Sequence, residues 1–368
     1  QTEGDSTLRL RHMRLAVDGD RVLAHVRIFA RTMLVRGVPV TAGGIGSVAS
    51  HPDARGAGYV TALLRDADAQ MRREGMGIAF LFTGIPAFYE RTGWRLVRQP
   101  GFDADAAEAA GIPANTEYRV RRIRDNDFDA LRRIYRRATS GNTGAIVRTP
   151  RTWRDAQRWL DEDAEGCLVA ERSGDVVAYA RSRTRDYGYR YGYQLLEAEH
   201  VAGEEAAIDA LVTRAAKRAS TLGLPLTALV PADHALAAVL RGLPSTREST
   251  TVTHPMMMRV ASLRGLLVAL LPQISVRANA VPGPSFRVAI HAPDGERHVL
   301  DIRPTRVRAV GNAAPSDYDL HVDATLDALV GQRAPGVLLR PHAPVEVQRR
   351  MDALLPPVPL HFWNSDRI

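Results

Sequence analysis

A short glycine-containing turn between a strand-like run and a helix-like run constrains this chain more than any other feature. Residues 46–51 are rich in small and β-prone residues, Pro52 ends that run, and two glycines follow. Apolar residues then recur at helical spacing from Val60. At such a turn the first N–H groups of the helix and the positive end of its dipole point in the same direction. This arrangement favours the binding of a phosphate. The turn is not a Walker A loop, because no Gly-Lys-Ser/Thr follows, and the dinucleotide fingerprint Gly-x-Gly-x-x-Gly is absent.

The turn resembles the acetyl-coenzyme A loop of the GCN5-related N-acetyltransferases (GNAT superfamily), whose pattern is Arg/Gln-x-x-Gly-x-Gly/Ala. Arg55 and Gly58 fit the first and fourth positions, whereas Val60 replaces the small sixth residue. Residues 78–84 are typical of the next strand, and residues 86–94 resemble the family's Phe-Tyr-x-x-x-Gly-Phe/Trp segment. The resemblance implies that acetyl-CoA binds as a cosubstrate at Val48, Ala49, Ser50, Arg55, Gly56, Ala57, Gly58 and Tyr59.

Acetyl transfer to an amine needs hydrogen-bond donors that stabilise the negative charge developing on the thioester oxygen. It also needs a proton for the departing thiolate. Three glycines in residues 43–46 permit either a simple bulge or a strand that splays from its neighbour, and the exposed N–H of Val48 is then the candidate donor. The resemblance assigns the proton to Tyr89, because a phenol with a pKa of about 10 can protonate a thiolate. The alternative is that Tyr89 only packs beside Phe88 and Trp94.

The order of elements predicts three domains in the 368 residues. We expect a catalytic GNAT domain at 1–115, a second, degenerate GNAT domain without its own coenzyme at 116–258, and a domain resembling the sterol carrier protein fold at 259–368. The predicted fold class is α/β (α+β), with mixed central sheets in both GNAT domains. This order resembles the enhanced-intracellular-survival (Eis) type of acetyltransferase.

The Eis resemblance also implies that the C-terminal carboxylate is the base that accepts the proton of the amine. In this chain that role would fall on the carboxylate of Ile368, although the last residue of Eis-type acetyltransferases is usually aromatic. A frayed tail is the alternative, but Phe362 and Trp363 are large apolar groups that favour a packed one. Asp366 and Asp53 are poorer base candidates, expected to be solvated or to cap a helix. The same resemblance implies a homo-oligomer, possibly a hexamer.

Composition excludes several other classes of function. The net charge is +8, but Lys217 is the only lysine and the arginines are scattered among acids, so we predict no nucleic-acid partner. Cys167 stands alone and the histidines lack metal-ligand spacing, so no metal is expected. There is no apolar run long enough for a membrane span and no leader-like segment, and a cytoplasmic location is predicted.

These features favour an enzyme, an acetyl-CoA-dependent N-acetyltransferase whose primary-amine acceptor attacks directly in a ternary complex. The acceptor could be a small molecule, a peptide or a lysine side chain, and the sequence does not select among them. The alternative is a non-catalytic carrier of a lipid or small ligand in the C-terminal domain, with the coenzyme loop idle.

Overall fold

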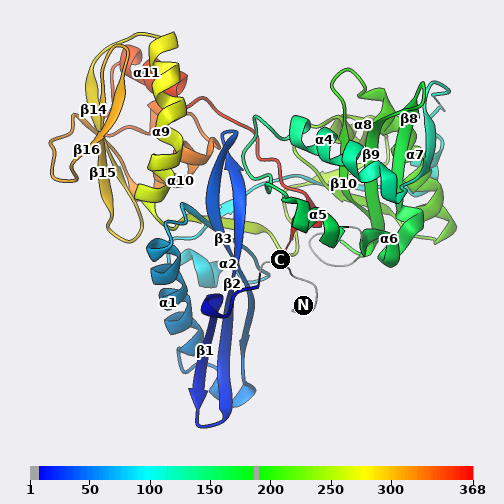
Figure 1. Ribbon diagram of the computed structural model, residues 1–368, viewed down its shortest axis with the longest axis horizontal. Coiled ribbons are helices and arrows are strands. Elements are labelled where there is room, and N and C mark those ends of the chain that lie inside the picture. The colour runs from blue at the N-terminus through cyan, green and yellow to red at the C-terminus, as the bar shows by residue number, and fades with distance from the viewer. Residues whose placement is uncertain (1–7, 114, 157, 186–189, 368) are drawn as a thin grey trace. The chain divides into compact units, whose positions relative to one another are not determined.

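The chain divides into two compact units in a computed structural model that describes residues 8–113, 115–156, 158–185 and 190–367 (Figure 1). The unit that we call the N-terminal unit joins residues 8–97 to Met256–Val358. The central unit joins Arg98–Pro255 to Pro359–Arg367. Both units contain mixed sheets covered by helices, so the predicted α/β (α+β) fold class is confirmed.

A six-stranded sheet forms the first part of the N-terminal unit. In spatial order its strands are β1 (Met13–Asp18), β2 (Arg21–Val35), β3 (Val38–Ser50), β4 (Ile78–Phe82), β13 (Met256–Val260) and β5 (Arg95–Val97). β2 and β3 form a long antiparallel hairpin, whereas β3 and β4 run parallel. A parallel pair needs a crossover, and helix α1 (Tyr59–Arg73) supplies it along β2, as Figure 1 shows. The short helix α2 (Pro86–Glu90) follows β4.

Strand β13 contains the residues at which the second and third domains are predicted to meet. It pairs antiparallel with β4 on one side and β5 on the other, so the predicted boundary after residue 258 falls inside this strand. All five residues of β13 are buried. A strand between two others and covered on both faces needs such an apolar run, which the three methionines provide. The run predicts a strand but not its partners, because pairing is set by residues far away in the sequence.

The rest of the N-terminal unit is a four-stranded sheet with three main helices. The strands, in spatial order, are β16 (Val307–Val310), β15 (Arg297–Ile302), β14 (Phe286–His291) and β17 (Tyr318–Leu320). The helices are α9 (Leu263–Ala280), α10 (Val322–Val330) and α11 (Val345–Leu354), and α9 lies along this sheet in Figure 1.

Arg36, at the tip of the β2–β3 hairpin, ties these two parts together. Its side chain is 1% exposed and donates hydrogen bonds to the carbonyls of Leu329 at 2.8 Å and Leu355 at 3.2 Å, and to those of Ala328 and Pro356. Burial, together with the nearby Arg277, lowers the pKa of Arg36 to about 9. The carbonyls at the ends of two helical segments therefore receive donors from a hairpin tip distant in sequence.

A seven-stranded sheet forms the central unit. In spatial order its strands are β12 (Arg247–Ser249), β6 (Gly101–Ala104), β11 (Leu226–Leu229), β10 (Gly192–His200), β9 (Asp175–Arg185), β8 (Cys167–Arg172) and β7 (Arg119–Arg122). The helices are α3 (Ala106–Ala110), α4 (Phe128–Ala138), α5 (Pro150–Ala156), α6 (Arg158–Asp163), α7 (Ala206–Thr221) and α8 (Ala235–Arg241).

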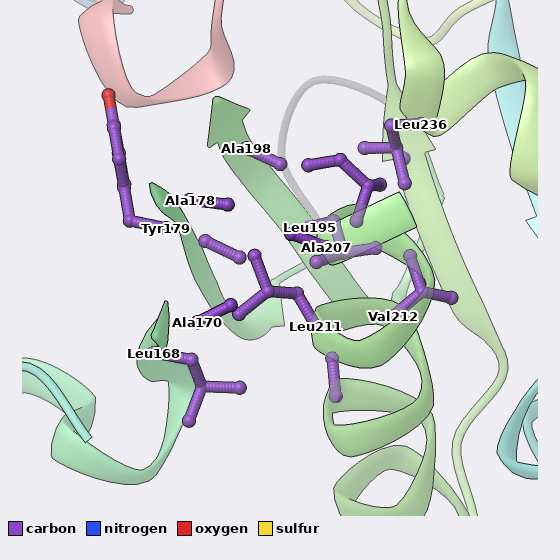
Figure 2. Close-up of a cluster of buried hydrophobic side chains, with 14 of the residues drawn as sticks. Leu168, Ala170, Ala178, Tyr179, Leu195, Ala198, Ala207, Leu211, Val212 and Leu236 are labelled. Carbon is purple, nitrogen blue, oxygen red and sulfur yellow. The ribbon is translucent and has the colours of Figure 1, made fainter. Parts of the chain in front are cut away.

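The core of the central unit lies between its sheet and α7. In Figure 2 the side chains of Leu211 and Val212 on α7 lie among those of Leu195, Ala170 and other small residues of the strands. Tyr179 points away from this cluster, because alternate residues of a strand face opposite sides of the sheet. Among the described residues of the chain, no helix is both long and apolar enough to cross a membrane.

Candidate active site

The pairing of β3 with β4 ends at the place where the glycine-rich run predicts an opening. Their parallel pairing extends from Ala42 with Ile78 to Ile45 with Leu81. Strand β3 then continues to Ser50, paired with β2. Gly46–Ser50 therefore extend past the last residue of β3 that pairs with β4, and the sequence-predicted Val48, Ala49 and Ser50 all lie in this stretch.

A β-bulge lies within the same stretch of β3. Arg27 of β2 pairs with Gly46, but His25 pairs with Ala49, so β3 has one residue more than β2 over this interval. Ser47 adopts a φ of 49°, and its carbonyl accepts a hydrogen bond from Nδ1 of His25 at 2.8 Å. A bulge redirects the backbone groups that follow it, which suits the donor role proposed for the N–H of Val48. The bulge, one of the two alternatives of the sequence analysis, is present, whereas a splay of β3 from β4 stays a prediction.

The predicted turn connects β3 to the start of α1. Pro52–Ala54 form one 3-10 turn, and the Nδ1 atom of His51 accepts a hydrogen bond from the N–H of Asp53 at 3.3 Å. Helix α1 begins at Tyr59, and the first hydrogen bond of the helix runs from the N–H of Ala62 to the carbonyl of Gly58 at 3.0 Å. The N–H groups of the three residues before Ala62 therefore have no partner inside the helix and point out of its positive end.

Gly56 and Gly58 give this turn its shape and its open surface. Their φ angles are 79° and 82°, in the left-handed region that favours glycine. A Cβ added to either residue would meet no atom within 4 Å, so the space in front of the turn is open. Arg55, Ala57 and Tyr59 are also exposed. An anion approaching the helix start could thus contact backbone donors directly, which fits the pyrophosphate of coenzyme A.

Tyr89 lies on α2, packed at right angles to two aromatic neighbours. Its ring centroid is 5.0 Å from that of Phe88 and 6.2 Å from that of Trp94. The side chain is 6% exposed, and burial raises the pKa of its phenol. A raised pKa keeps the hydroxyl protonated at neutral pH, as a proton donor requires. Packing and catalysis, posed as alternatives by the sequence, are therefore compatible.

One apolar cluster brings several predicted elements of the site together. Tyr89 belongs to the same buried cluster as Ile45 of β3, and Val48, Phe88 and the Val60 of α1 pack against it. Strand β3, the first turn of α1 and α2 therefore converge. Ile368, the predicted base, lies outside the described residues, so that role stays a prediction.

The central unit contains a similar parallel pair of strands but uses it differently. Strands β10 and β11 pair in parallel from Tyr193 with Leu226 to Leu195 with Ala228, and β10 then continues to His200 past a bulge. Buried polar side chains on this strand hold the segment 359–367, which we call the tail. Gln194 accepts from Nδ2 of Asn364 at 2.6 Å, and Oε1 of Glu199 accepts from Nε1 of Trp363 at 2.8 Å.

Asp366 of the tail is held by Arg148, whose side chain is 3% exposed. Arg148 donates two hydrogen bonds to Asp366, both at 2.9 Å, and two to Glu197, at 2.7 and 2.6 Å. Burial alone would lower the pKa of Arg148, but Asp366 and Glu197 hold it well above its usual value. The expectation that Asp366 is solvated or capping is therefore wrong, whereas the expected packing of Phe362 and Trp363 is confirmed by their burial.

Sequence reasoning missed this polar cluster of the central unit, although a signal was present. Gln194, Glu197 and Glu199 lie in a run otherwise typical of a buried strand, and a charge on such a strand needs a partner. The partners Arg148 and His361 are distant in sequence, so no local pattern joins them. Among the described residues, no group of His, Cys, Asp and Glu is arranged to hold a metal ion.

Comparison with known proteins finds a family that the first part of the chain resembles. Residues 1–97 match the family described as acetyltransferase (GNAT) domain. An uncharacterized N-acetyltransferase of Streptomyces avermitilis is 30% identical over 180 residues, which are 46% of this chain and 44% of that protein. A second one, from Streptomyces coelicolor, is 29% identical over 158 residues, 40% of this chain and 38% of that protein. The match thus spans less than half the length of these curated relatives.

Solved structures resemble almost the whole chain in fold. A GCN5-related N-acetyltransferase from Kribbella flavida has a TM-score of 0.70 at 18% identity, covering 97% of this chain and 87% of that one. Eis1 from Mycobacterium abscessus has a TM-score of 0.67 at 16% identity, covering 97% of this chain and 90% of that one. At these identities the likeness concerns the fold.

Proposed function

We propose that this protein is an acetyl-CoA-dependent N-acetyltransferase that transfers the acetyl group to a primary amine by direct attack in a ternary complex. The observation that carries the proposal is the exposed glycine turn of α1, which follows the part of β3 that extends past β4, and the packing of Tyr89 in one cluster with residues of β3 and α1. The match of residues 1–97 to an acetyltransferase domain supports the same reaction.

In this proposal, backbone groups hold the cosubstrate and stabilise charge. The N–H groups at the start of α1 and those of Gly56 and Gly58 bind the pyrophosphate, because the N–H groups of Arg55 and Ala57 already donate to the carbonyls of Pro52 and Ala54. The N–H of Val48 or its neighbour, beyond the bulge, faces the thioester oxygen, where negative charge develops as the amine attacks. Such fixed donors cost little reorganisation during the reaction.

Tyr89 supplies the proton in the last step. When the bond between the acetyl carbon and sulfur breaks, the thiolate takes the phenolic proton, and free coenzyme A leaves as a thiol. The burial of Tyr89 keeps that proton on the phenol until a base as strong as the thiolate appears. A base must also take the proton from the amine. The candidate predicted from the sequence is the C-terminal carboxylate of Ile368.

Four finer points remain proposals beside the reaction. They are the division at residues 115 and 258, the degenerate nature of the second GNAT-like domain, the sterol-carrier likeness of residues 259–368, and a homo-oligomeric assembly. The placement of the tail on β10 favours the second point, because protein side chains take the hydrogen-bonding groups of that strand.

The test is a coenzyme A release assay with a panel of primary amines. We expect thiol release that requires both acetyl-CoA and an amine, with an equal amount of N-acetylated product seen by mass spectrometry. Thiol release that is independent of any amine would indicate a hydrolase instead. No release with any amine would favour the non-catalytic carrier.

A further inference from the structure

A cavity of about 700 Å³ lies in the central unit and takes no part in the proposed acetyl transfer. Residues of α4, β9, the end of β10 and α8 line it, together with His361 of the tail. Polar and apolar side chains line it in similar numbers, and the apolar part includes Ala130, Ile134, Val176, Val177, Ala235 and Ala238. This volume and lining suit a small organic molecule with an apolar body.

Glu199 forms the polar floor of this cavity, with a side chain that is 1% exposed. Its Oε1 atom accepts hydrogen bonds from Nε2 of His361 at 2.7 Å and from Trp363. Its Oε2 atom has a single long contact, with Nε2 of His234 at 3.4 Å. A buried carboxylate oxygen with spare accepting capacity is costly unless a donor reaches it.

The histidines around Glu199 favour its charged form, although burial disfavours a positive charge on His234. Nδ1 of His234 accepts a hydrogen bond from the N–H of Leu236 at 3.0 Å, and burial lowers the pKa of His234. Burial alone would raise the pKa of Glu199, but His361 and His234 hold it well below its usual range. The floor therefore carries a carboxylate whose ion-pair partners, among the described residues, are imidazoles only.

The remaining polar lining also favours a cation. His200 donates from Nδ1 to the carbonyl of Val201 at 2.9 Å, so in that tautomer its Nε2 is an acceptor. Glu199 and three other carboxylates line the cavity, against two guanidinium groups; these residues are Asp175, Glu205, Asp233, Arg133 and Arg137. Because no described group has metal-ligand geometry, an organic cation fits better than a metal ion.

We propose that this cavity binds a compact primary amine as its ammonium ion, which donates to Oε2 of Glu199 while its carbon chain lies against the alanine and valine walls. An ammonium group has three donors and no acceptor, which matches the open carboxylate oxygen and the acceptor nitrogen of His200. The site is separate from the acetyl-transfer residues, so amine binding here does not depend on the proposed reaction.

Three molecules of equal length and different charge test the proposal on the full chain without acetyl-CoA. Titration calorimetry would compare pentylamine, 1-pentanol and pentanoate at about pH 8, where an alkyl ammonium stays charged. We expect pentylamine to bind about tenfold or more tightly than the other two, a difference of about 1.4 kcal/mol. Equal binding of the alcohol, a preference for pentanoate, or no binding of pentylamine would each overturn the proposal.

Variants then locate the bound amine. Glu199→Gln keeps an oxygen that can accept from His361 and Trp363 but removes the charge, and should weaken pentylamine binding about tenfold. Because this change touches the tail, Ala238→Trp serves as a second variant: it fills the cavity from an exposed wall position and should abolish binding without lowering the thermal midpoint.

Ala232→Trp is the matched control, since Ala232 is exposed on the same segment but does not line the cavity. It should bind pentylamine like the unaltered chain. Full binding by Ala238→Trp would show that the amine lies elsewhere and would overturn the proposal. These measurements need no turnover, so failure of the acetyltransferase proposal would be seen separately in the coenzyme A assay.

Discussion

Tyr89 combines two properties that matter at the scale of a single residue. It is buried between two aromatic rings, which fixes the direction of its hydroxyl, and the same burial raises the pKa of the phenol. Its place in the Phe-Tyr-x-x-x-Gly-Trp segment was enough to single it out in the sequence. The raised pKa was not predictable in the same way, because it depends on β-strand and helix residues packed around it.

Tyr89→Phe removes the proposed proton donor while keeping the packing. We expect kcat to fall about a hundredfold, as for loss of a general acid, with the Kd for acetyl-CoA nearly unchanged. Steady-state kinetics and calorimetric titration of acetyl-CoA measure the two quantities. The exposed Tyr191→Phe is the control for a lost hydroxyl, and an unchanged kcat in Tyr89→Phe would remove Tyr89 as the acid.

At the scale of elements, the turn before α1 is the feature that the sequence predicted best. The strand, the glycines and the helix start at Tyr59 are all local signals, so they could be located without tertiary information. The bulge at Ser47 was only one of the permitted outcomes of a glycine-rich run. Its position depends on the pairing with β2, which the run itself does not contain.

Gly58→Ala tests the anion-binding role of this turn. Alanine at a φ of 82° should cost about 1 kcal/mol of folding stability, and the distorted turn should weaken acetyl-CoA binding about tenfold. Gly19→Ala is the matched control, because Gly19 also has a positive φ and open space around its Cα. If both variants bind acetyl-CoA as the unaltered chain does, the turn does not hold the phosphates.

The C-terminal end of α1 gives a pH-dependent contact between elements. Burial alone would raise the pKa of Glu74, but hydrogen bonds from His12, Gln70 and Arg11 lower it to about 2. A carboxylate with a lowered pKa in the folded state stabilises that state fully above its unfolded pKa of about 4.3, and this contribution is lost as the pH falls towards 2.

Glu74→Gln should therefore lower the free energy of unfolding at neutral pH, by about 1 kcal/mol for a partly exposed contact, and make it less dependent on pH between about 4.3 and 2. Chemical denaturation at several pH values measures both effects. An equal pH dependence in the variant and the unaltered chain would contradict the assignment of this contact. The exposed Glu90→Gln is the control for loss of a carboxylate.

At the scale of the whole molecule, segments far apart in sequence complete each unit. Strand β13, which begins at residue 256, lies between β4 and β5 in the N-terminal sheet. The tail binds polar side chains of β10 in the central unit. Arg36, at the tip of the β2–β3 hairpin, donates hydrogen bonds to backbone carbonyls of residues 328, 329, 355 and 356. Each unit is therefore built from discontinuous pieces, and a boundary drawn along the sequence divides one of them.

Arg36→Met should destabilise the N-terminal unit strongly, because buried carbonyls lose their donor. We expect a loss of about 3 kcal/mol in the free energy of unfolding, measured by chemical denaturation. Arg65→Met, at an exposed position of α1, should change it by less than about 0.5 kcal/mol. A small effect of Arg36→Met would mean that the hairpin tip contributes little to holding the two sheets of this unit together.

Local features could be predicted from the amino-acid sequence: the glycine turn, the helix that follows it, the position of Tyr89, and the strands that alternate with helices. These depend on residues within a few positions of each other, whose spacing and conformational preferences are visible in one stretch of chain. Only the tertiary structure decided the partners of β13, the docking of the tail on β10, and the pairing of Arg148 with Glu197 and Asp366. Such contacts join residues that are distant in the sequence, and burial strengthens each ion pair only after the fold has brought its members together.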